Sequence, residues 1–307
     1  MSLDSFAPVN KSLVDFVLPV SEQGYPVHLA AADTRDVLMD VCRGAGAKPR
    51  DFPKELWIEP KDWAAKAKEN DENGTWPMNF IDRYTNQSPT HECTTHSISR
   101  GFEAARNRQR GLKFNDGPKA GFRYEHSKNG VVWVSIMSVY AEANPGQWGG
   151  ASIQGPMEIA ARRGFLPDKL QPAEYRFKHT LQGTAGKGNN NQSSGPWTRV
   201  GGFQPGWEET AKLFRVDQVI FPEMWEQAVC LVLHGRFYHV GRSGHAIPWG
   251  QARFNGGSLS GMDYPDSYDT TRNDSLGTVK RAWSGGFSID TVTVPDNWLD
   301  PAGTLAT

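Results

Sequence analysis

Apolar residues recur with the period of a helix in several parts of the first half of the chain. Residues 33–46 and 61–71 each show this spacing and predict a helix. Residues 146–167 predict a glycine turn followed by a helix that ends near Gly164. The run at 131–143 carries an apolar stripe that fits either a strand or a helix. Helix is therefore the main expectation for this half.

The second half shows a different pattern. A polar tract rich in Gly, Asn and Ser at 182–196 predicts a flexible surface loop that separates the two halves. Residues 214–227 predict a short helix, and the apolar run at 229–233 predicts a buried strand. The turn HGRF then leads into a second strand. Strands are therefore expected to dominate here.

Composition narrows the class of protein. The chain has 307 residues, 38% hydrophobic and 22% charged, so it can bury a sizeable core in one large or two modest domains. The formal net charge of -1 gives no basic surplus for binding nucleic acid. No stretch approaches the ~20 apolar residues that span a bilayer, and the first residues lack the pattern of a secretory signal. We expect a soluble protein, cytoplasmic or particle-associated, with no nucleic-acid or membrane partner.

The three cysteines differ in their surroundings. Cys42, Cys93 and Cys230 are odd in number and irregularly spaced, which fits neither a disulfide framework nor a zinc pattern and favours a reducing compartment. Cys42 and Cys230 lie in apolar segments and are expected in the core. Cys93 lies in the polar stretch THECTTHS, which is unusual for a structural thiol.

The segment after Cys93 predicts a helix. Ile98, Phe102 and Ala105 fall on one face, and the charged residues between them are expected mostly on the other faces. Cys93 then lies at the first turn, where unpaired N–H groups and the helix dipole stabilise a thiolate. Two interpretations stay open on this evidence, a reactive thiolate and a buried structural thiol.

The second half supplies candidate partners for that thiol. His234 and His239 flank the predicted turn, and His245 follows a glycine at the start of an apolar strand. A histidine at the entry of a strand can hold its ring against a facing helix terminus. A metal site formed by His91, Cys93 and His96 is a local alternative, because such closely spaced ligands can share an ion.

Four short motifs occur in order along the chain. They are Asn86-Gln87 with Cys93 six residues after the glutamine, Trp148-Gly149-Gly150, His245-Ala246-Ile247, and Asp266-Ser267-Tyr268-Asp269. The cysteine and the histidine are 152 residues apart. In order and spacing the set resembles the papain-like cysteine peptidases.

The resemblance implies a fold and its divisions. The fold would be α+β and papain-like, with a helical half packed against an antiparallel β-rich half and a cleft between them. Residues 1–75 would form an N-terminal extension and residues 291–307 a C-terminal tail. Residues 76–290 would form the papain-like domain, with its helical half at about 76–182 and its β-rich half at about 196–290.

The resemblance also implies residue roles. Cys93 would be the nucleophile, His245 the base that forms the thiolate–imidazolium pair, Asp266 the residue that orients the ring, and Gln87 a donor to the oxyanion. The substrate-binding residues would be Trp148, Gly149 and Gly150. No cofactor or metal is implied.

Two classes of function follow. One is a divergent thiol peptidase acting on a peptide or protein substrate. The other is a papain-like domain used as a structural or binding part of a larger assembly, such as a viral or phage particle, among other protein subunits and with little catalysis. Two further thiol enzymes fit less well: compact cell-wall amidases have a shorter Cys-to-His span, and THECTTHS does not resemble the nucleophile turn of a glutamine amidotransferase.

Overall fold

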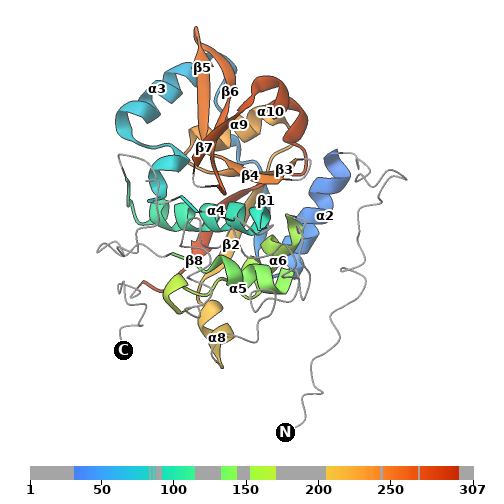
Figure 1. Ribbon diagram of the computed structural model, residues 1–307. Coiled ribbons are helices and arrows are strands. Elements are labelled where there is room, and N and C mark those ends of the chain that lie inside the picture. The colour runs from blue at the N-terminus through green and yellow to red at the C-terminus, as the bar shows by residue number, and fades with distance from the viewer. Residues whose placement is uncertain are drawn as a thin grey trace, which may run out of the picture.

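The computed structural model combines helices with mainly antiparallel sheets, which is an α+β architecture (Figure 1). It describes residues 31–82, 84–85, 87, 92–114, 133–143, 153–170, 205–242, 245–268 and 270–296. The helices are α2 (Ala31–Gly44), α3 (Trp63–Asn73), α4 (Cys93–Gln109), α5 (Ile136–Ala143), α6 (Gln154–Arg162), α8 (Trp207–Ala211), α9 (Trp225–Leu233) and α10 (Leu276–Ala282). The strands are β1 (Lys48–Asp51), β2 (Arg215–Phe221), β3 (Tyr238–Arg242), β4 (His245–Trp249), β5 (Gln251–Asn255), β6 (Ser258–Asp266), β7 (Thr270–Ser275) and β8 (Ser288–Thr293).

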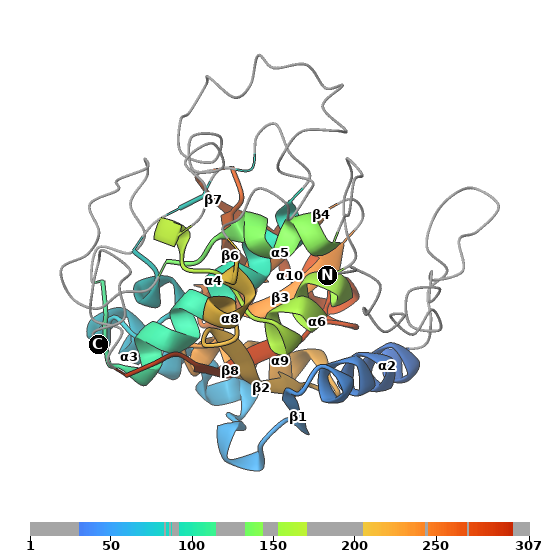
Figure 2. The same ribbon diagram turned by 90° about the horizontal axis from the view of Figure 1, so that it is seen from below.

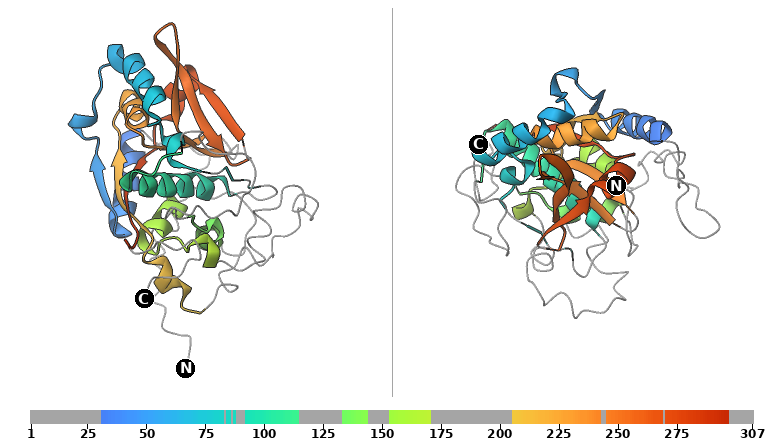
Figure 3. Two further views of the ribbon diagram at one scale, coloured as in Figure 1. Left: turned by 90° about the vertical axis from the view of Figure 1, so that its left-hand side faces the viewer. Right: turned by 90° about the horizontal axis from the view of Figure 1, so that it is seen from above.

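Helix α4 runs through the middle of the molecule. Figure 1 and the left view of Figure 3 show it between strands β5–β7 on one side and helices α5 and α6 on the other. Every residue of α4 from Cys93 to Asn107 is buried. The charged residues expected mostly on the faces other than that of Ile98 and Phe102 are therefore buried as well, up to Arg106. Arg100 is buried because the helix is covered on all sides here, and its guanidinium forms an ion pair with Glu103 at 2.9 Å.

Three small sheets surround this helix. Their orders are β1-β2-β8, β3-β4 and β5-β6-β7, and every pairing is antiparallel except that of β1 with β2. Figure 2 shows β1 at the edge of the first sheet, beside α2. Strand β4 contacts both α4 and β6. The start of α4, the start of β4 and the end of β6 can therefore meet.

Two apolar cores lie against different faces of α4. Ile98 and Phe102 belong to the first, together with residues of α2, α6, β2 and β8. Ala104 belongs to the second, which contains α9, the β3–β4 hairpin and parts of β5 and β6. The aromatic rings of Phe102 and Phe165 lie 5.2 Å apart in the first core. Burial of large apolar side chains on both sides holds the helix in place.

Most expected helices of the first half are present. The patterns at 33–46 and 61–71 correspond to α2 and α3, and residues 136–143 of the ambiguous run at 131–143 form α5. Helix α6 is followed by Gly164, whose φ of 88° suits glycine. A Cβ at this position would lie 2.1 Å from the carbonyl oxygen of Ala211. The glycine turn before α6 and the tract at 182–196 lie outside the described residues.

Two expectations for the second half are wrong. Residues 215–221, expected within a short helix, form β2, the central strand of a sheet that pairs with β1 on one side and β8 on the other. Residues 229–233, expected to be a strand, belong to α9. A short apolar run has no period that separates a buried helix from a buried strand. Cys230 is nevertheless fully buried, as is Cys42 on α2.

Part of the expected N-terminal extension is built into the fold. Strand β1 pairs in parallel with β2, and α3 packs on α9. The side-chain amide of Asn70 on α3 donates to the carbonyl oxygen of Leu233 at 2.8 Å. The expected start of the tail at 291 falls within β8. The division into extension, domain and tail itself stays a prediction. In the described part of the chain, no helix is long and apolar enough to cross a membrane.

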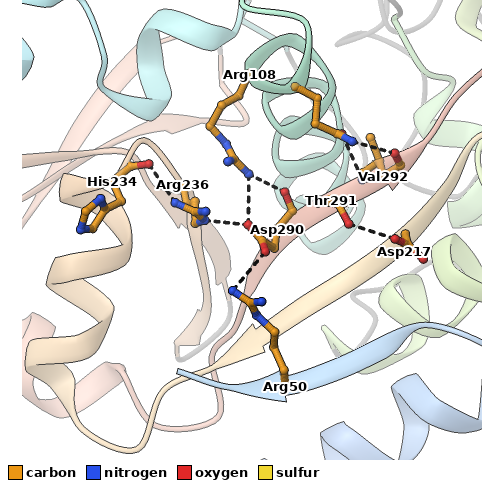
Figure 4. Close-up of polar contacts among 9 residues, drawn as sticks. Arg50, Arg108, Asp217, His234, Arg236, Asp290, Thr291 and Val292 are labelled. Carbon is orange, nitrogen blue, oxygen red and sulfur yellow. Dashed lines mark hydrogen bonds and ion pairs between the residues drawn. The ribbon is translucent and has the colours of Figure 1, made fainter. Parts of the chain in front are cut away.

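A cluster of charged side chains connects helix α4 with strands β1 and β8 and with the segment just before the β3–β4 hairpin (Figure 4). Asp290 on β8 is almost fully buried, and its carboxylate lies 2.8 Å from Arg236, 3.4 Å from Arg108 and 3.5 Å from Arg50. Burial would raise the pKa of Asp290, but the arginine charges outweigh it and lower the pKa. Burial, with the charge of Arg236, lowers the pKa of Arg108 to about 10. The carboxylate of Asp290 thus interacts with three arginine side chains that come from separate segments of the chain.

Candidate active site

Three of the four predicted catalytic residues come from the elements that meet beside α4. Cys93 is the first residue of α4, His245 the first of β4, and Asp266 the last of β6. All three are mostly buried, with the Cys93 residue only 8% exposed and the His245 side chain 18% exposed. Because strand β4 contacts α4 and β6, the histidine lies between the thiol and the carboxylate.

The ring of His245 contacts both neighbours. Its Nε2 lies 2.8 Å from Oδ1 of Asp266, and the side chain of Cys93 is close enough to the ring to contribute to its raised pKa. Since Nε2 is engaged by the carboxylate, Nδ1 is the nitrogen left for the thiol. The hydrogen bond that the ring donates to Asp266, followed by the interaction with Cys93, raises the pKa of His245 to about 9 against the opposing effect of burial. The imidazole is therefore protonated at neutral pH.

Asp266 is held from two sides. Its Oδ1 also accepts the backbone N–H of Ser267 at 2.8 Å, and its Oδ2 forms an ion pair with Nε of Arg272 at 2.7 Å. Burial alone would raise the pKa of Asp266, but the hydrogen bond and charge of His245, with the charge of Arg272, lower it below its ordinary value. The carboxylate is thus anionic and faces a cationic ring.

Gln87 lies beside the segment that follows β6. Its backbone N–H donates to the carbonyl oxygen of Ser267 at 2.7 Å, and its Oε1 accepts the Ser267 hydroxyl at 2.7 Å. Its Nε2 donates to the hydroxyl of Tyr268 at 2.8 Å. These bonds attach the segment before α4 to the end of β6. Gln87 is buried, at 3% exposure.

Two further residues complete the surroundings of the histidine. The ring of Tyr268 stacks on that of His245, with centroids 6.1 Å apart and an interplanar angle of 30°. The guanidinium of Arg272 lies 5.7 Å from the Tyr268 ring centroid. Sequence reasoning placed Tyr268 in a motif but gave it no role, and it missed Arg272. The signal for Arg272 is the strand register, which only the structure shows.

A small, mostly polar cavity lies beside these groups. It is lined by Thr85, Cys93, His96, Ser97, Arg100, Ala246, Pro248, Pro265, Asp266 and Ser267. Inside it, Nδ1 of His96 lies 2.6 Å from the hydroxyl of Thr85. The cavity lies between the first turns of α4 and the strands that carry the histidine and the aspartate. The expected cleft residues Trp148, Gly149 and Gly150 lie outside the described residues.

No metal site is seen among the residues that the structure describes. They contain no group of three or more His, Cys, Asp or Glu side chains placed to hold an ion. His91, which the metal alternative requires together with Cys93 and His96, lies outside that part of the chain. His96 itself lies 3.5 Å from the carboxylate of Glu92.

Comparisons with known proteins give one distant likeness. The structure is similar to the crystal structure of xylellain, a cysteine protease from Xylella fastidiosa, with 12% sequence identity and a TM-score of 0.48. The likeness covers 80% of this chain and 95% of that chain. No family model matches the sequence, and no curated protein sequence matches it. The function is therefore argued from the geometry of the site.

Proposed function

We propose that this protein is a papain-like cysteine peptidase with Cys93 as nucleophile and His245 as acid and base. The observation that carries the proposal is the position of His245, whose ring bonds Asp266 at 2.8 Å and interacts electrostatically with the side chain of Cys93. A cationic ring beside a thiol is the arrangement that keeps the sulfur as a nucleophilic thiolate at neutral pH.

The same three groups can carry the whole reaction. The Cys93 thiolate attacks the peptide carbonyl carbon and forms a tetrahedral intermediate. As this collapses, the C–N bond breaks, His245 gives its proton to the leaving amine, and a thioester remains. The neutral imidazole then takes a proton from water, whose oxygen attacks the thioester carbon; the C–S bond breaks and releases the acid, leaving the Cys93 thiolate beside the imidazolium again. Asp266 holds the ring in one orientation throughout. No cofactor is needed for these steps.

The oxyanion would be stabilised at the start of α4. The backbone N–H groups of the first helical turn have no acceptor within the helix, and Cys93 is the first helical residue. Its N–H is therefore the first proposed donor to the developing charge. The side-chain amide of Gln87, held in place by Ser267, is the second. Trp148, Gly149 and Gly150 are proposed to line the substrate cleft.

The papain-like assignment rests on which helix and which strands carry the proposed catalytic groups. The thiol begins a buried helix, the histidine begins strand β4, which packs against that helix, and the aspartate ends strand β6, which packs against β4. The order cysteine, histidine, aspartate along the chain agrees with the motifs in the sequence. Among the described residues, no observation favours the alternative role as a passive part of a larger assembly.

Hydrolysis of a reduced, unfolded protein tests the proposal. Wild-type protein should cleave it, and Cys93→Ser and His245→Gln should each abolish cleavage while the circular dichroism spectrum stays unchanged. His234→Gln is the matched control, because His234 ends α9 and interacts with none of the three catalytic groups. Cleavage that persists at the wild-type rate in Cys93→Ser would overturn the proposal.

A further inference from the structure

Arg272 forms an ion pair with the carboxylate oxygen of Asp266 that does not contact His245. In the β6–β7 hairpin, Asp266 pairs with Thr270 and Tyr264 pairs with Arg272. Residues two apart on one strand share a face, so Arg272 is the diagonal neighbour of Asp266 on the same face. Its Nε lies 2.7 Å from Oδ2, while Nε2 of His245 lies 2.8 Å from Oδ1.

Arg272 also covers the second group that touches the histidine. Its guanidinium lies over the ring of Tyr268, which stacks on His245. The Arg272 side chain is 57% exposed, whereas that of Asp266 is 1% exposed. Arg272 therefore covers a buried carboxylate from the solvent side. It contacts both neighbours of the catalytic ring, the carboxylate at its edge and the aromatic ring at its face.

Other charged groups around the site have partners of their own. Arg242 faces His245 across the β3–β4 pair, and Arg100 and His96 line the cavity from α4. The pairs are Arg242 with Asp274, Arg100 with Glu103, and His96 with Glu92. Arg272 differs from these because its partner is the carboxylate that binds the histidine. A change of charge at Arg272 is therefore passed directly to the ring.

We infer that Arg272 is a positioning residue that acts on His245 through Asp266, keeping Oδ1 aimed at the ring and offsetting part of the carboxylate charge. A fully uncompensated carboxylate would hold the proton on the imidazole more tightly. A general acid works best when its pKa lies near the working pH. Arg272 thus limits how strongly the ring retains the proton that it must give to the leaving amine. This consequence rests on the proposed function, but the charge coupling does not.

The first test needs no catalysis. The pKa of His245 is measured by NMR titration, with its signal assigned by its absence in His245→Gln. Arg272→Gln keeps a donor for Oδ2 but removes the charge, so it should raise the pKa of His245 by about half a unit, less than a fully buried charge would because Arg272 is solvent-screened. Arg272→Lys should stay within about 0.2 units of wild type because it keeps the charge.

The matched control is Arg253→Gln. Arg253 on the neighbouring strand β5 is also partly exposed, and its carboxylate partner is Asp263 rather than Asp266. It should leave the pKa of His245 unchanged. High salt should move wild type toward Arg272→Gln, because exposed charges are screened. An unchanged or lowered pKa in Arg272→Gln, or an equal rise in Arg253→Gln, would overturn the inference.

Activity then separates the two proposals. If the protein is a peptidase, the alkaline limb of its pH profile should move upward in Arg272→Gln by the same amount as the NMR value. If the NMR shift is found but wild type hydrolyses nothing, the proposed function fails and the coupling stands. If wild type hydrolyses its substrate but the pKa does not move, the coupling fails and the proposed function stands.

Discussion

Nε2 of His245 lies 2.8 Å from Oδ1 of Asp266, and this contact is the first cause of a histidine pKa raised to about 9. A histidine with its ordinary value would be mostly neutral at pH 7.5. The carboxylate therefore does more than orient the ring. It extends the cationic form through the neutral range, where the proposed peptidase mechanism requires a cation beside Cys93.

Replacing that carboxylate should shift the pH dependence of activity. The pKa of His245 is raised in the folded protein, so the imidazolium is present at lower pH and is lost as pH rises through about 9. Asp266→Asn keeps the shape but removes the charge, so the alkaline limb should move to lower pH. The pH profile of hydrolysis measures this shift. An alkaline limb that stays at its wild-type pH in Asp266→Asn would show that the charge of Asp266 does not keep the proton on His245.

The same linkage applies to stability. A raised folded pKa means that the His245–Asp266 contact contributes fully below the unfolded histidine value of about 6.5. The contribution declines as pH rises through about 9. The difference in free energy of unfolding between wild type and His245→Gln should therefore be larger at pH 6 than at pH 10. Urea unfolding at the two pH values measures it, and a difference that grows with pH would contradict the assignment.

Gln87 should affect turnover and not thiol reactivity. Loss of an oxyanion donor typically costs on the order of 100-fold to 1000-fold in rate. Gln87→Ala should therefore lower kcat by about this factor while Cys93 is alkylated at nearly the wild-type rate. The control is Gln109→Ala, because Gln109 ends α4 and bonds the backbone of Val292, far along the helix from the thiol. Equal loss of alkylation and hydrolysis in Gln87→Ala would assign the residue to the thiol instead.

Cys93 should be the one cysteine that reacts under mild conditions. Burial raises the pKa of Cys42 to about 12 and also raises that of Cys230, so both stay protonated. Both are fully buried, whereas Cys93 borders the cavity. Brief iodoacetamide treatment followed by peptide mapping should find label at Cys93 alone, and His245→Gln should slow it. Equal labelling of all three cysteines would contradict this.

The sequence carries the local motifs of the site but not the contacts around them. Cys93 could be placed at a helix start because Ile98 and Phe102 repeat with helical period. Arg272 could not be assigned, because its relation to Asp266 depends on which residues pair across the β6–β7 hairpin. That register is set by the packed sheet and not by any local pattern.

The parts of the fold that could not be predicted from the sequence have a similar cause. The run at 229–233 is apolar throughout, so its pattern could not show that α9 is a helix buried on all sides. The charged residues of α4 were expected mostly on the faces away from Ile98 and Phe102, and the pattern could not show that these faces are buried too. Arg100 and Glu103 neutralise each other in the interior instead. In both α9 and α4, other parts of the chain cover more than one face of the helix, which a local sequence pattern does not reveal.

Asp290 should be a main contributor to stability. Removing one partner of a buried ion pair typically costs about 3–5 kcal/mol, because the other charge is left without compensation. Asp290→Asn leaves Arg108 and Arg236 as neighbouring, partly buried cations, so the free energy of unfolding of this variant at pH 7 should fall by an amount near the lower end of that range. The exposed Arg50 adds little.

Asp217→Asn is the matched control for that substitution. Asp217 lies on the adjacent strand β2, and its ion-pair partner Lys48 is largely exposed (Figure 4 shows Asp217 beside the cluster). An exposed pair of this kind is worth about 0–1 kcal/mol. Because the pKa of Asp290 is lowered, its contribution is present at neutral pH and is lost as pH falls through that lowered value. Urea unfolding should therefore show a gap between Asp290→Asn and wild type that narrows in acid. Equal losses for the two aspartates at pH 7 would mean that the arginine cluster is held by packing and not by the charge of Asp290.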